Sequence, residues 1–258
     1  MQMTFHQYIT NPLGKKAAVF SQRDMYNKLY TDKYGAILLR ENGTFETHFY
    51  VDKQNDRYFC YMKVPSEVVE KFYYDVVIEF FPIDATNATA NTVDNYGVRF
   101  FSNDPAFVFV YEYVFNENDM FIAELKSRAS KQALRSKPDE KNPYRTPGYV
   151  KSIYFCYLHM KYRGLFNKTY WKQYGEKFNI RSLINQITPS DKKIADRQRL
   201  GAEVAEKKAK EEKTQKRNQT ANAQKRATTI KKPKGGIRVV QPVRPIKKKP
   251  NQHVNVKK

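Results

Sequence analysis

The sequence contains few cysteines, histidines and glycines, and each shortage excludes a class of protein. The two cysteines, Cys60 and Cys156, cannot build a disulfide framework or a four-ligand zinc site, which favours a reducing compartment. Four histidines do not supply the missing ligands. The ten glycines are scattered, and none stands in a phosphate-binding loop of the GxxxxGK[ST] or GxGxxG type. We therefore predict neither a metal ion nor a cofactor.

The chain also lacks long apolar runs and a balance of charge. No apolar run approaches the ~20 residues of a membrane helix, and the N-terminus has no apolar signal core. We therefore expect an unprocessed protein that is not secreted and has no membrane partner. Lys and Arg outnumber Asp and Glu by 47 to 26, a net charge of +21, which favours nucleic acid, acidic lipid or acidic protein as a partner.

The aromatic residues divide the chain in two. All 17 Phe, all 19 Tyr and the single Trp precede Pro189, whereas residues 189–258 carry 22 Lys and Arg against 6 Asp and Glu. Without aromatic rings, this segment cannot bury enough apolar surface to offset an ordering cost of roughly 1 to 2 kcal/mol per residue. We predict a globular domain over 1–188 and a basic tail over 189–258.

The tail consists of two segments that differ in amino-acid composition. Residues 191–227 are rich in Ala, Glu, Lys, Gln and Arg and contain no proline, which predicts a long solvated helix. Its apolar residues are too sparse for a heptad seam, so a coiled coil is the weaker alternative. Residues 228–258 combine Lys and Arg with four prolines, which predicts an extended arm.

The globular part has the pattern of an α+β fold: a mostly antiparallel sheet of five to seven strands with flanking helices and a C-terminal helical group, ahead of the basic tail. Asn42-Gly43 is a strong hairpin signal between two of the strands. Helical patterns cover 21–35, 119–135, 149–166, 167–178 and 180–187. Alternating or β-branched patterns predict strands over 36–41, 44–51, 57–64, 72–81, 97–102 and 106–115.

No catalytic residue emerges from a strong motif, because the chain contains neither GxSxG nor HExxH. The remaining candidate is Glu124 with Lys126, preceded by acids such as Asp75, Glu79 and Asp104. Metal-dependent nucleases use an acid and a Glu-x-Lys on a strand to bind magnesium and position water. Helical spacing is the more convincing pattern here, so we interpret both side chains as a solvated helix face and keep the nuclease as a remote alternative.

Trp171 lies among Lys168, Lys172 and Lys177, a mixture that could stack on exposed bases. We favour the alternative that these rings pack a helical group into the sheet, because aromatic residues are dense throughout this region. His48 and His159 are interpreted as structural or exposed, since neither has a second histidine at i+3 or i+4. Both cysteines lie in apolar, aromatic runs and are interpreted as small buried hydrophobic residues.

The basic arm carries the most specific signal. Residues 213–258 contain 15 Lys and Arg and no acid, more than solubility requires. Such an arm follows a phosphate backbone without reading bases. The candidate nucleic-acid-binding residues are Lys231, Lys232, Lys234, Arg238, Arg244, Lys247, Lys248, Lys249, Lys257 and Lys258.

The sequence resembles virion structural proteins of tailed bacteriophages, the crAss-like group among them. The resemblance rests on the aromatic-rich α+β body, the basic tail and the Asn-rich composition of segments such as NATANTVDNYGVRFFSND. The resemblance implies a capsid, portal-vertex or connector component, assembled in the host cytoplasm and located in the virion.

Two functions follow from these observations. The first is a non-enzymatic virion structural or assembly protein whose C-terminal arm contacts packaged nucleic acid or neighbouring subunits. The alternative is a nucleic-acid-binding accessory protein of replication, packaging or translation. Both predict sequence-independent binding of nucleic acid through the tail, and the first adds other structural subunits as partners.

Overall fold

The computed structural model describes residues 2–10, 45–84, 89–138, 142, 145, 147, 148 and 150–229. The chain forms two compact units, Met1–Lys207 and Lys208–Lys258. The predicted helix over 21–35, the strand over 36–41 and the Asn42-Gly43 hairpin lie outside the described residues, as does the arm from 230 onward.

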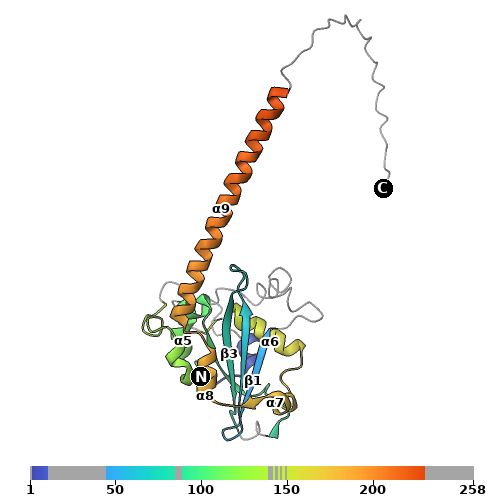
Figure 1. The fold of residues 1–258 in the computed structure, drawn as a ribbon. Coiled ribbons are helices and arrows are strands. Elements are labelled where there is room, and N and C mark those ends of the chain that lie inside the picture. Colours follow the sequence, from blue (N-terminus) through green and yellow to red (C-terminus); the bar gives the residue numbers. More distant parts are fainter. Residues whose placement is uncertain are drawn as a thin grey trace, which may run out of the picture. The chain divides into compact units, whose positions relative to one another are not determined.

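Within the described residues, one five-stranded sheet forms the centre of the first unit (Figure 1). Its order is β4-β3-β2-β1-β5. The four long strands pair antiparallel, whereas the two-residue β5 pairs parallel to β1. The strands are β1 (Glu46–Asp52), β2 (Arg57–Pro65), β3 (Tyr73–Phe81), β4 (Gly97–Ser102) and β5 (Glu176–Lys177). The α+β class and the mostly antiparallel sheet are therefore confirmed.

Helices lie against both faces of this sheet (Figure 1). The rings of Phe5 and Trp171 pack on Phe80, which places their helices on one face. On the other face, the Tyr50 hydroxyl donates to Gln186. The first face carries α1 (Phe5–Thr10), α6 (Lys151–Tyr162) and α7 (Lys168–Tyr174), and the second carries α8 (Ile180–Gln186).

The predicted strand over 106–115 is wrong. The segment forms a π-helical turn, η1 (Phe107–Tyr111), that continues into α5 (Glu112–Glu117). Asp104 starts the turn, because its carboxylate accepts the Ala106 N–H at 2.8 Å. The helical conformation also places the ring centre of Phe115 5.8 Å from that of Phe100 in β4. Packing against the sheet thus overrides the strand propensity of an aromatic and β-branched run.

The predicted α-helix over 119–135 is also wrong. Phe121 forms a bridge to Phe100, and the Ile122 N–H donates to the Phe100 carbonyl at 3.2 Å, so this stretch runs along the edge of β4. A short 3-10 helix, η2 (Ala123–Arg128), and turns follow. The helical spacing of apolar residues therefore reflects an edge contact followed by a tight turn.

Candidate nucleic-acid interface

The predicted tail helix is confirmed as α9 (Ser190–Thr229), which has 40 residues. At 1.5 Å per residue it is about 60 Å long. The side chains of 208–222, in the second unit, are all exposed. Its last acid is Glu212, and five basic residues follow inside the helix: Lys213, Lys216, Arg217, Lys225 and Arg226.

Local interactions support α9, which contains few apolar residues. Asp191 lies in its first turn, where the helix dipole favours negative charge, and all six acids of the helix precede Lys213. Arg199 and Glu203 add an i,i+4 ion pair at 3.1 Å. Between Lys213 and residue 222, α9 therefore presents only positive charge to solvent.

The first turns of α9 pack on the body. The Lys193 ammonium lies 3.7 Å from the carboxylate of Asp75, which is buried in β3. Ile194, 9% exposed, packs in a small cluster with Val108 and Ala133. The compact unit consequently ends after Lys207, beyond the predicted boundary at 188, because aliphatic and ionic contacts extend the body where aromatic residues have ended.

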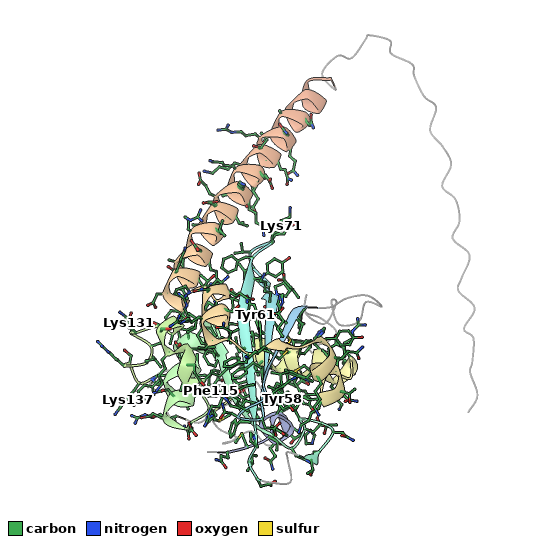
Figure 2. The ribbon with its side chains drawn as sticks, turned by 60° about the horizontal axis from the view of Figure 1, so that its bottom comes forward. Tyr58, Tyr61, Lys71, Phe115, Lys131 and Lys137 are labelled. Atoms are coloured by element: carbon green, nitrogen blue, oxygen red, sulfur yellow. The ribbon has the colours of Figure 1, made fainter. Side chains whose placement is uncertain are left out.

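Asp75 is held by several donors from distant segments. Its oxygens accept hydrogen bonds from the Tyr61 hydroxyl at 2.8 Å, the Asn103 amide at 2.7 Å and the Thr188 N–H at 3.1 Å. Tyr61 lies inside the body (Figure 2). This carboxylate therefore joins the sheet to the segment that leads into α9.

A groove of about 630 Å³ lies on the body beside the β1–β2 turn. Three exposed lysines from three different elements line it: Lys53 from the turn, Lys172 from α7 and Lys177 from β5. The other lining residues are Val51, Asp52, Gln54, Asn55, Gly175, Glu176 and Phe178. Sequence reasoning grouped Lys172 with Lys177 but missed Lys53, which only the pairing of β5 with β1 brings to the same groove.

Gly175 allows this arrangement. Its N–H caps α7 by donating to the Trp171 carbonyl at 2.7 Å. A Cβ atom at this position would collide with that carbonyl oxygen and with the Val51 side chain. The absence of a side chain therefore lets the chain turn directly from α7 into β5, alongside β1.

Trp171 and Lys168 do not contribute to the groove. Trp171 is fully buried, and its ring packs 4.7 Å from Phe49, as the structural interpretation predicted. Lys168 is also buried, and its ammonium donates to the Tyr96 hydroxyl at 2.5 Å and lies 4.0 Å from Asp56. Burial lowers the pKa of Lys168, while Asp56 opposes this effect.

Two of the nuclease candidate residues, Glu79 and Glu124, meet at Arg57, whereas Asp75 and Lys126 belong to other surroundings. Glu124 accepts a hydrogen bond at 2.6 Å from Arg57, which also donates to the buried Glu79 at 3.0 Å. Asp75 belongs to the cluster described above, and Lys126 is exposed. No three carboxylate, histidine or cysteine side chains among the described residues are grouped to hold a metal ion. Glu124 thus belongs to an ion-pair network and not to a solvated helix face.

His159, Cys60 and Cys156 are buried, and His48 is half-buried. His159 is buried, and burial lowers its pKa to about 4. His48 stacks on Tyr61 with ring centres 5.6 Å apart. Cys60 and Cys156 are fully buried, and burial raises the pKa of each thiol well above its ordinary value.

The ten candidate residues of the arm, from Lys231 to Lys258, lie outside the described residues. Among the helices of the described part, none combines the length and apolar character needed to cross a bilayer. Comparison with known proteins found no match to any family, curated protein or solved structure.

Proposed function

We propose that this protein is a non-enzymatic structural or assembly protein of a nucleoprotein particle. In this proposal the body contacts other subunits, and the C-terminal arm, together with the end of α9 from residue 213, contacts the phosphate backbone of nucleic acid. The main support is the end of α9, which carries no acid after Glu212, is exposed as far as residue 222 and leads into a segment rich in Lys and Arg.

The physical basis is counterion release. Residues 213–226 span about 20 Å of helix at 1.5 Å per residue. This span carries five basic residues, and a duplex carries one charge per ~1.7 Å of its axis. Contacts of this kind position a protein on nucleic acid without specifying a base sequence. The arm is therefore expected to bind many sequences with similar affinity.

The resemblance of the sequence to tailed-phage virion proteins supports a virion as the particle, with a capsid, portal-vertex or connector position and assembly in the host cytoplasm. A second candidate, an accessory protein of replication, packaging or translation, is favoured by the lysine-lined groove, because this groove would give the body a contact with nucleic acid of its own. Sedimentation separates the two: incorporation into a stoichiometric particle supports the first, and a free monomer that binds polynucleotide supports the second.

The arm is tested by titrating duplex DNA at several salt concentrations. Six to eight phosphate contacts give a slope of log K against log salt of about −5 to −7, at roughly −0.9 per contact. Replacing Lys247, Lys248 and Lys249 with glutamine is expected to make the slope shallower by up to about three, without changing sequence preference. A flat salt dependence, or no binding at low salt, would refute nucleic-acid binding by the arm.

A matched control for this variant is the control triple, Lys71→Gln, Lys131→Gln and Lys137→Gln, which removes the same charge from the body. All three side chains are exposed, and Figure 2 shows them at the periphery. The control triple is expected to bind as the wild type does. An equal loss in both variants would show that net charge, and not the arm, governs binding.

A further inference from the structure

We propose that the groove lined by Lys53, Lys172 and Lys177 is a second binding site, which receives a short segment of single-stranded nucleic acid. It lies entirely within the body and shares no residue with the arm. The inference therefore goes beyond the proposed function, and either one can fail without the other.

The charge of the groove favours phosphate. None of the three lysines forms an ion pair within the part of the chain that the structure describes. Asp52, one of two carboxylates in the lining, is already held by Arg57 at 3.2 Å and by the side-chain amide of Asn55 at 2.8 Å. Apart from Asp52, the lining therefore contains three ammonium groups and one carboxylate, that of the exposed Glu176, so positive charge is in excess.

The size and lining of the groove favour an unpaired strand over a duplex. Its volume of about 630 Å³ lies within the ~300 to 1,000 Å³ range of sites that enclose small ligands. A duplex keeps its bases stacked inside, whereas a single strand can place a base in such a cavity while its phosphates meet the lysines. Phe178 supplies apolar surface for a base, and the exposed Gln54 side chain supplies hydrogen-bonding groups.

The elements that carry the groove are held in place before any ligand binds. Asp52 accepts hydrogen bonds from the backbone N–H groups of Gln54 and Asn55, which fixes the β1–β2 turn. The Phe178 ring stacks on Phe59 at 4.1 Å, with an angle of 7° between the rings. A preformed site loses less conformational entropy on binding.

Lysine footprinting of the full chain tests the site directly. The protein is acetylated briefly with and without a short oligothymidylate, and protected lysines are identified by mass spectrometry. Protection of Lys53, Lys172 and Lys177 is the expected result. Parallel reactions contain a duplex of the same length, inorganic phosphate or polyglutamate. If any of these protects the three lysines equally well, the assignment to single strands is overturned.

A charge variant adds a second measurement. The groove triple, Lys53→Gln, Lys172→Gln and Lys177→Gln, is compared with the control triple by following the fluorescence of Trp171, the only tryptophan. The arm contains no aromatic residue, so this signal reports on the body. Each phosphate contact with a single strand contributes ~0.7 to the slope of log K against log salt, so the loss of three contacts makes this slope shallower by about two. Lowering the salt from 1 M to 0.1 M is then expected to strengthen binding by the groove triple roughly 100-fold less than binding by the control triple.

The outcomes separate the groove from the arm. Unchanged melting temperatures show that both triples remain folded. Protection of arm lysines without protection of the groove lysines refutes the groove and leaves the proposed function intact. Equal binding by the groove triple and the control triple also refutes it.

Discussion

Replacing Glu112 with glutamine tests how strongly the body responds to pH. Glu112 lies in α5 and is fully buried, and one carboxyl oxygen accepts the Ser130 N–H at 3.3 Å. Burial raises the pKa of this carboxyl to about 8, the Ser130 hydrogen bond opposes the increase, and the nearby charge of Asp191 adds to it. The side chain is therefore mostly protonated at pH 7.

The sign and size of the effect follow from proton linkage. In the unfolded chain the carboxyl has an ordinary pKa of 4.5, so between pH 4.5 and about 8 the folded state holds a proton that the unfolded state has lost. The stabilising contribution of this proton is complete below pH 4.5 and is lost as pH rises through about 8. At ~1.4 kcal/mol per pH unit, the free energy of unfolding decreases by about 3 kcal/mol between pH 4.5 and pH 7.

Glutamine keeps the shape of the protonated side chain and does not titrate. We expect Glu112→Gln to match the wild type near pH 4.5 and to exceed its free energy of unfolding by about 3 kcal/mol at pH 7. Urea unfolding of both proteins across this range provides the measurement. A stability difference that does not change with pH would refute the argument, because it would mean that Glu112 titrates alike in the folded and unfolded states.

Two further predictions concern the base of α9 and the Arg57 network. A fragment ending at Lys207 is expected to melt at a temperature close to that of the full chain. A fragment ending at Thr188 loses the burial of Ile194 and therefore about 2 kcal/mol of its free energy of unfolding. Equal melting temperatures of the two fragments would contradict the anchoring role of Ile194. Arg57→Met leaves the buried Glu79 with Arg99, at 3.7 Å, as its remaining cation and is expected to cost about 3 kcal/mol in urea unfolding. Glu124→Gln, at a side chain 31% exposed, is expected to cost about 1 kcal/mol or less, and a larger loss than for Arg57→Met would reverse our assignment.

Local patterns were enough for several elements. The predicted strand over 57–64 corresponds to β2, and the strand over 72–81 to β3, because a short, continuous run of aromatic and β-branched residues is typical of a strand buried on both faces. The predicted helix over 191–227 corresponds to α9, since helix propensity decides in a segment with little tertiary packing. The segments 106–115 and 119–135 were missed because their conformation depends on contacts with β4, which lies outside each local window.

The candidate site divides in the same way. The positive charge of the arm is a property of composition and can be read without a structure. The groove could not be predicted, because Lys53 is far along the chain from Lys172 and Lys177 and meets them only through the pairing of β5 with β1.

The sequence by itself determined that the aromatic residues precede a basic segment, that the successive long strands pair antiparallel and that a long helix follows them, because composition and short-range periodicity control these features. Only the tertiary structure decided that Lys193 and Ile194 anchor the tail helix, that three lysines share one groove and that Glu112 holds its proton. The physical reason is that burial and charge pairing arise between segments distant in sequence, and their energies depend on distances that no local pattern contains.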